Sequence, residues 1–109
     1  QRSMGELTAV SAMDFEIMLR DLEHITTIQP DFAMAHYNRA NILAIMRNYT
    51  DAIRAYTAAI AADEDFAEAY FNRGLTRIYI GNHQQGLEDL SRAGELGIYQ
   101  AYNLITRFQ

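Results

Sequence analysis

Residues 31–39 read DFAMAHYNR, and residues 65–73 read DFAEAYFNR. Six of the nine paired positions are identical, and the second stretch begins 34 residues after the first. The pairs Asn48/Asn82 and Ala59/Ala93 have the same offset. A fixed period of this length indicates stacked supersecondary units.

Each unit is expected to be a pair of helices, because its apolar residues recur at helical spacing and this pattern is interrupted once. In the first unit Asp31 is expected to cap a helix over residues 32–46. Asn48, with Asp51 three residues later, then starts a second helix that extends to about Ala62. The predicted buried face of this second helix consists of Ala52, Ile53, Tyr56, Ala59 and Ile60.

The second unit has the same order of helix start and stop signals. Asp65 with Glu68 is typical of a capping box, and Gly81 of a helix stop. Asn82, with Gln85 three residues later, predicts the next helix start.

The flanking residues extend the same pattern. Residues 14–28 are predicted to form the second helix of a partial first repeat, with Phe15, Met18, Leu22 and Ile25 on one face and Pro30 ending it. Residues 1–13 are either a linker or part of its partner helix. After the second unit, Tyr99, Tyr102, Ile105 and Phe108 recur every three residues, which predicts a closing amphipathic helix.

The predicted fold is therefore all-α: an α-solenoid of antiparallel helix hairpins in a single domain over residues 1–109. It would contain two full repeats, a partial N-terminal repeat and a C-terminal closing helix. The predicted segments are 1–13, 14–30, 31–64, 65–98 and 99–109.

Composition limits the classes of partner. The net charge is −5 and all nine cations are arginines spread along the chain, which disfavours nucleic acid because phosphate binding needs clustered cations. No apolar stretch approaches the roughly 18 residues that a membrane span needs. The chain begins with Gln1, so we expect a processed or excised piece. With no cysteine, the compartment stays open, and we favour the cytoplasm.

The two units resemble tetratricopeptide repeats, whose 34-residue unit carries the pattern W-x2-L-G-x2-Y … A-x3-F … P. The similarity covers residues 13–98 and lies in spacing more than in identity. The first unit has His36, Arg39, Ala40 and Leu43 at the first four motif positions, and Ala52, Tyr56 and Ala59 keep the small-aromatic-small order of the second helix. In the second unit Tyr70 and Gly74 match the pattern better, and Pro30 is the one family proline present.

The resemblance implies a non-catalytic scaffold that binds a protein or peptide on the concave face lined by the first helix of each hairpin. The implied binding residues are Met34, Tyr37, Asn38, Asn41, Glu68, Phe71, Asn72 and Leu75. Alternatively, Asn38 and Asn72 bond within the array and the aromatic residues simply pack.

Two further interpretations concern partners. The chain could instead be a self-association or assembly module attached to a larger protein or enzyme, with a homo-oligomer formed through its terminal helices. Some family members hold the carboxylate of chaperone C-termini with a lysine- and arginine-based clamp. We reject that ligand class here, because this chain has no lysine and Tyr37 takes a cationic position of the clamp.

Arg39 and Arg73 stand at a position that is normally apolar, so each needs a partner if it is buried. We expect structural ion pairs with Asp21 and Asp89.

No catalytic residue, metal site or cofactor is predicted. His24, His36 and His83 fall on separate elements without the spacing of metal ligands. The acidic run at residues 63–65 lacks the glycine and distal glutamate of a calcium loop. The chain has no glycine-rich phosphate loop and no nucleophile elbow.

Overall fold

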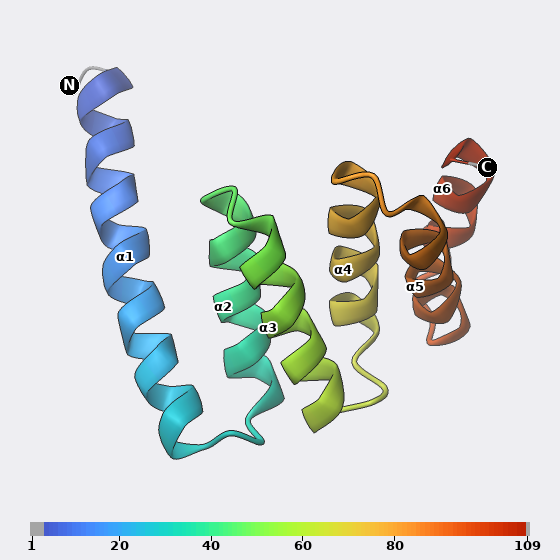
Figure 1. The fold of residues 1–109 in the computed structure, drawn as a ribbon, viewed down its shortest axis with the longest axis horizontal. Helices are drawn as coiled ribbons and strands as arrows, with labels where there is room; N and C mark the ends of the chain where they lie inside the picture. Colours follow the sequence, from blue (N-terminus) through green and yellow to red (C-terminus); the bar gives the residue numbers. More distant parts are fainter. Residues whose placement is uncertain (1–3, 109) are drawn as a thin grey trace.

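Six helices account for most of the chain (Figure 1). The computed structural model describes the backbone of residues 4–108 and the side chains of residues 12–108. The helices are α1 (Met4–Ile28), α2 (Ala33–Ile45), α3 (Tyr49–Ala62), α4 (Ala67–Tyr79), α5 (His83–Glu95) and α6 (Gln100–Phe108). No strand occurs in the described part of the chain, so the all-α prediction is confirmed.

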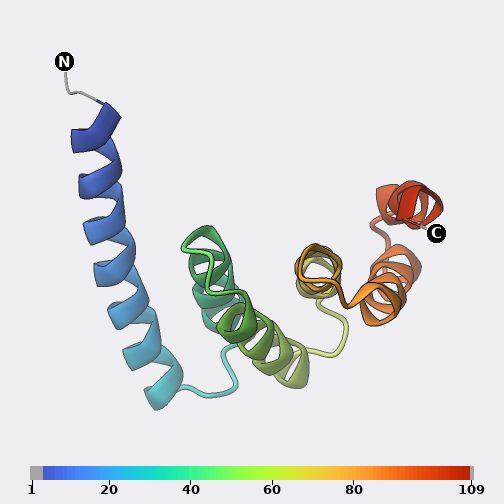
Figure 2. The same ribbon diagram turned by 45° about the horizontal axis from the view of Figure 1, so that its top comes forward.

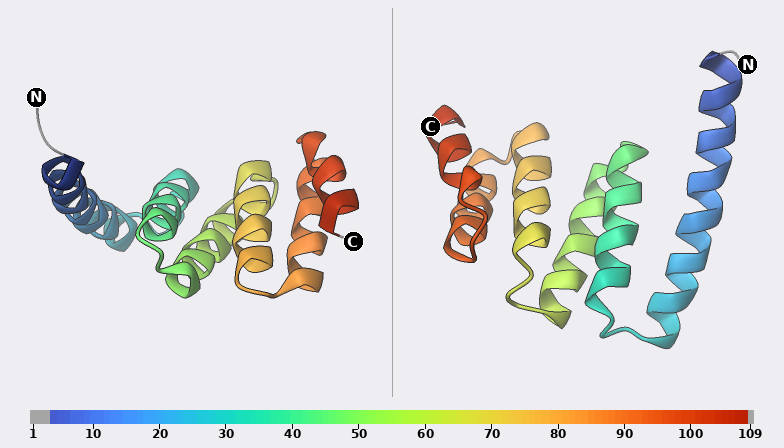
Figure 3. Two further views of the ribbon diagram at one scale, coloured as in Figure 1. Left: turned by 90° about the horizontal axis from the view of Figure 1, so that it is seen from above. Right: turned by 180° about the vertical axis from the view of Figure 1, so that it is seen from behind.

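The helices form two hairpins, α2/α3 and α4/α5, with one helix on either side of them. In order along the chain they follow one another along the long axis (Figure 3) and bend into an arc with α1 and α6 at its ends (Figure 2). α2 and α4 contact each other across the hairpin boundary. Each hairpin therefore completes its burial against its neighbour, as in a solenoid.

The two helices of the second hairpin approach very closely at Gly74 and Gly86. A Cβ atom on Gly86 would lie 2.7 Å from the Gly74 carbonyl oxygen, and one on Gly74 would lie 2.8 Å from the Gly86 carbonyl oxygen. Ala40 and Ala52, one period earlier, are completely buried at the corresponding contact of the first hairpin. Small residues at these positions set the interhelical distance.

The helix starts differ from the predicted caps. α2 and α4 begin after Phe32 and Phe66, so Asp31 and Asp65 lie outside the N-cap position and the predicted capping box is wrong. Asn48 and Asn82 do occupy the N-cap positions of α3 and α5, yet neither side chain makes a capping bond. The four N-cap ψ angles, 64° to 89°, lie below the extended region in which a cap side chain faces the first turn.

Three helices end in the same hydrogen-bonded turn, with a left-handed residue at Arg47, Gly81 or Gly97. After α2, the Arg47 N–H donates to the Ala44 carbonyl oxygen at 3.0 Å, and the Asn48 N–H donates to that of Leu43 at 2.8 Å. The same pair of bonds follows α4 and α5. This is the Schellman motif, which favours glycine at the left-handed position, so the prediction of a helix stop at Gly81 is confirmed.

α1 begins at Met4 and continues without interruption to Ile28. Residues 14–28 are helical, as predicted, but residues 4–13 belong to the same helix and do not fold back beside it. The division of the chain into repeats at the predicted boundaries stays a prediction. None of the described helices is long and apolar enough to cross a membrane.

Arg47 has a φ angle of 66°, and the equivalent residue of the next repeat is Gly81. An L-residue in this conformation costs roughly 1–2 kcal/mol, a cost that glycine avoids. We therefore expect Arg47→Gly to raise the free energy of unfolding by about 1 kcal/mol in urea denaturation. Arg54→Gly, in the exposed middle of α3, should lower it by about 1 kcal/mol. A loss of stability in both variants would contradict the proposed strain at Arg47.

Candidate binding surface

A polar network joins the two hairpins where α2, α3 and α4 meet. The Asn72 amide donates to the Tyr37 hydroxyl and to Asn41 Oδ1, both at 3.0 Å. The Tyr56 hydroxyl also donates to Asn41 Oδ1. Tyr37 packs against Phe66, with ring centroids 4.8 Å apart. Three of the eight candidate residues, namely Tyr37, Asn41 and Asn72, therefore bond with one another inside the array.

The other five candidates fall into two groups. Phe71 and Leu75 are half-buried and pack against the core cluster formed by α4, α5 and α6. Met34, Asn38 and Glu68 are exposed. Met34 and Glu68 occupy the same station of successive repeats, so they lie in corresponding places on α2 and α4.

Two apolar hollows lie beside these helices. The first, of about 450 Å³, is the α1–α2 hollow, lined by Phe15, Met18, Asp21, Leu22, Ile25, Asn38, Asn41, Ile42 and Ile45. The second, of about 410 Å³, is the α4–α6 hollow, lined by Leu75, Ile78, Tyr79, His83 and Phe108. Both could take apolar side chains of a bound segment.

Burial raises the pKa of Tyr56 to about 12, and the neighbouring Tyr37 contributes to the rise. The Asn72 side chain acts in the opposite direction. Tyr56 therefore remains a neutral hydroxyl, able to donate to Asn41, throughout the physiological pH range.

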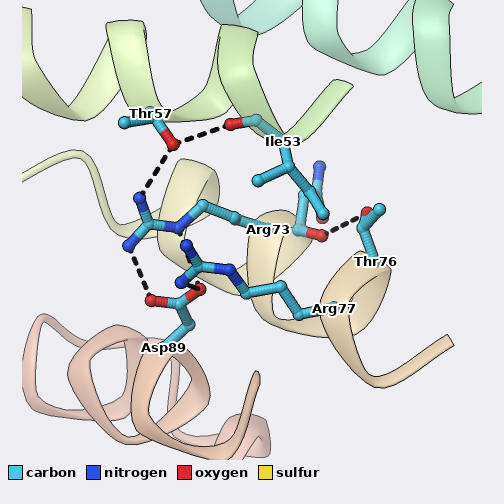
Figure 4. A network of polar contacts seen from close by, with 7 residues as sticks. Ile53, Thr57, Arg73, Thr76, Arg77 and Asp89 are labelled. Atoms are coloured by element: carbon cyan, nitrogen blue, oxygen red, sulfur yellow. Dashed lines mark hydrogen bonds and ion pairs between the residues drawn. The ribbon is translucent and has the colours of Figure 1, made fainter. Parts of the chain in front are cut away.

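A carboxylate in α5 holds two arginines of α4 (Figure 4). Arg73 binds Asp89 through Nε at 2.9 Å and Nη2 at 2.7 Å, and Arg77 Nη1 reaches the same carboxylate at 2.8 Å. Arg73 Nη1 also donates to Thr57 Oγ1 at 3.1 Å, which links the second hairpin to α3. The side chain of Asp89 is only 6 % exposed, so this is a buried charge with two partners. The predicted Arg73–Asp89 ion pair is confirmed.

The predicted Arg39–Asp21 pair is wrong. Arg39 instead lies 3.8 Å from Glu23, measured from Nε to Oε1. Thr57 lies 34 residues after Glu23, just as Arg73 lies 34 residues after Arg39. Each arginine therefore contacts the equivalent position of the preceding helix. Its own hairpin has Ala55 where the second hairpin has Asp89, so Arg39 has no bidentate carboxylate within its repeat.

The sequence did not single out Arg77 as a second partner of Asp89, or Thr57 as the link to α3. Arg77 lies four residues after Arg73, on the same face of a helix, which is a usable signal for a shared acceptor. The hydrogen bonds of Asn72 with Tyr37 and Asn41 were harder to predict from the sequence, because they depend on how far the second hairpin is rotated against the first.

A family model described as tetratricopeptide repeat matches residues 33–66, the stretch that contains α2, α3 and the loop that leads to α4. This agrees with the stacked hairpins and with the 34-residue offset. Residues 33–66 therefore form a tetratricopeptide repeat.

Solved structures share the fold of this chain at low sequence identity. The crystal structure of MamA has a TM-score of 0.80 and 23 % identity, and the match covers 83 % of this chain and 54 % of that one. The first such domain of Spaghetti (RPAP3), bound to the HSP90 peptide SRMEEVD, has a TM-score of 0.82 and 17 % identity, covering 93 % and 82 %. The TPR2B domain of yeast Sti1, in a complex with an Hsp70 segment, has a TM-score of 0.75 and 22 % identity, covering 91 % and 82 %.

A curated relative, a FAM10 family protein of Arabidopsis thaliana, is 28 % identical over 90 residues. The match covers 83 % of this chain and 20 % of the relative, so the chain spans about a fifth of that relative's length. Among the side chains of residues 12–108, no three His, Asp or Glu residues are grouped closely enough to hold a metal ion.

Removing the Asp89 carboxylate would leave Arg73 and Arg77 without their counter-charge. Because breaking a buried ion pair from one side costs about 3–5 kcal/mol, we expect Asp89→Ala to lower the free energy of unfolding by about 3 kcal/mol. Its exposed neighbour serves as the control: Glu88→Ala should change the value by less than about 0.5 kcal/mol. Equal effects in urea titrations of the two variants would argue against the ion-pair network.

Tyr56→Phe tests the hydroxyl that joins α3 to Asn41. At pH 8 we expect a loss of about 1 kcal/mol, because one hydrogen bond is removed. The unfolded tyrosine ionises near pH 10 and the folded one near 12, so the wild-type advantage is complete below pH 10 and falls as the pH rises toward 12. The measurement is the difference in unfolding free energy between wild type and variant across pH 8–12. Tyr99→Phe, at an exposed site, should show a constant difference.

Proposed function

We propose that this protein is a non-catalytic scaffold that binds a protein or peptide segment along the face of α2 and α4. The proposed contact residues are Met34, Tyr37, Asn38, Asn41, Glu68, Phe71, Asn72 and Leu75. Because Tyr37, Asn41 and Asn72 bond with one another, they would form the floor of the surface, and the exposed Met34, Asn38 and Glu68 would make the first contacts.

One observation carries this proposal. Equivalent positions of α2 and α4 carry exposed side chains, and an apolar hollow lies at each end of the face that these two helices form. Met34 is 48 % exposed, and Glu68 is its counterpart in the next repeat. The α1–α2 hollow lies toward one end and the α4–α6 hollow toward the other. The floor is fixed by side-chain hydrogen bonds, so a ligand would meet a preorganised surface. Tetratricopeptide repeats are typically non-catalytic interaction modules, which supports a binding function.

The charges on this face favour a neutral or cationic segment with apolar side chains. Two of the similar structures hold chaperone-derived segments, one of them the acidic peptide SRMEEVD. Here the arginines of α2 and α4 face acidic partners: Arg73 and Arg77 bind Asp89, and Arg39 lies near Glu23. Glu68 adds an exposed negative charge, so an acidic C-terminal peptide would meet no free cation among these three arginines.

The experiment is a selection of peptides from a phage-displayed library on the full chain, followed by fluorescence anisotropy with the recovered peptides. We expect the double variant Met34→Ala/Glu68→Ala to weaken their binding at least tenfold, because both side chains lie on the proposed contact face.

The matched control is Met13→Ala/Glu64→Ala, which removes the same exposed residue types from α1 and from the α3–α4 loop. It should leave the dissociation constants unchanged. The groove proposal fails if the recovered peptides bind both double variants as tightly as the wild type, or if they are selectively lost with the control.

A further inference from the structure

α1 exposes the side that its two counterparts bury. One period apart, Met18, Asp21 and Ile25 of α1 correspond to Ala52, Ala55 and Ala59 of α3 and to Gly86, Asp89 and Ala93 of α5. All six of the latter are buried, and in the second hairpin Gly86 packs against Gly74 and Asp89 binds Arg73 and Arg77 of the first helix. In α1, Met18 is 47 % exposed and Ile25 is 37 % exposed, and Asp21 is exposed as well. The position of a hairpin partner on α1 is therefore open.

The described part of the chain does not fill this position itself. α3 and α5 each begin just after a turn that reverses the chain, at Tyr49 and His83. α1 passes the equivalent point near Asp14 and continues as one helix back to Met4 (Figure 1). Residues 4–13 therefore continue the axis of α1 and do not lie beside it.

The open position is the α1–α2 hollow, and its polar groups match those of the filled position one repeat later. Asn38 corresponds to Asn72, whose amide donates to Tyr37 and Asn41 of the preceding first helix. Asp21 corresponds to Asp89, which binds two arginines of its hairpin partner. Among residues 12–108 no arginine or histidine lies within ion-pair distance of Asp21, because Arg39 approaches Glu23 instead.

We propose that the α1–α2 hollow binds an amphipathic helix of a partner protein, and that an arginine of this helix pairs with Asp21. The apolar lining from Phe15, Met18, Leu22 and Ile25 would cover the apolar face of that helix, as helix-in-groove recognition requires. This hollow forms one end of the proposed α2–α4 face, but the residues that test it are different. The two share Asn38 and Asn41 but neither Met18 nor Glu68, so each can fail without the other.

The second hairpin supplies the probe. The peptide of residues 67–80, AEAYFNRGLTRIYI, is the helix that fills the equivalent position beside Asp89 and carries Arg73 and Arg77. Labelled with fluorescein and titrated with the full chain, it should bind saturably. Met18→Glu should weaken its binding at least tenfold, because a carboxylate would enter the apolar lining.

Met13→Glu is the matched control, since Met13 is an equally flexible, 64 % exposed methionine of α1 that does not line the hollow. It should leave the affinity unchanged, and so should Met34→Ala/Glu68→Ala. Circular dichroism of each variant checks that the helices are retained.

A double-mutant cycle tests the ion pair. Asp21→Asn and the Arg73→Ala peptide should each weaken binding several-fold, and their combination should weaken it no more than the stronger single change. Glu16→Gln, which neutralises another exposed carboxylate of α1, should have no effect. Absence of saturable binding, equal losses with Met13→Glu and Met18→Glu, or fully additive effects of Asp21→Asn and Arg73→Ala would overturn the proposal.

Discussion

The structure depends on one constraint: a helix hairpin of this kind cannot bury both of its faces alone, so each one needs a neighbour. The side chains at the boundary between the hairpins show how that need is met. Asn72 of α4 bonds to Tyr37 and Asn41 of α2, and Tyr56 of α3 bonds to the same Asn41. These bonds lie beside an apolar cluster that includes Leu43, Ala55 and Phe66. Apolar burial supplies most of the stabilisation, and the amide network fixes the rotation of one hairpin against the other.

The two hairpins meet this constraint with different residues. The second has glycines at its closest approach and a carboxylate that binds two arginines, whereas the first has Ala40 and Ala52 at the approach and Ala55 in place of the carboxylate. A buried charge pair contributes more to choosing one packing arrangement than to net stability. The second hairpin is therefore held in a defined geometry by its own residues, while Arg39 of the first depends on Glu23 of α1.

Much of this fold could be predicted from the sequence, because the offset between residues 31–39 and 65–73 shows which positions of the two repeats are equivalent. It predicted both hairpins, the stop at Gly81 and the Arg73–Asp89 pair, all of which depend on positions within one unit. Contacts between units were harder to predict. Arg39 pairs with Glu23, which occupies the position where Thr57 meets Arg73 in the next repeat, whereas Asp21 occupies the position that faces a hairpin partner. The capping predictions failed for local reasons: α2 and α4 begin one residue later than expected, with phenylalanine at the N-cap, and Asn48 and Asn82 have ψ angles of 70° and 64°, outside the extended region. Among the candidate binding residues, the repeat pattern alone could not separate the exposed Met34, Asn38 and Glu68 from the three that bond internally.

The same equivalence explains why the α1 end of the array differs from its middle. In the two complete hairpins, the positions equivalent to Met18 and Ile25 are occupied by alanine or glycine, which suits a close contact between the two helices. On α1 these two positions carry larger side chains, a flexible methionine and an isoleucine, which cover apolar surface without needing such an approach. A larger or less regular helix could be accommodated there, since methionine adapts to irregular neighbours. The α1 surface is thus built differently from the inner contacts of the array, and its Asp21 keeps the charge that the second hairpin uses to hold arginine.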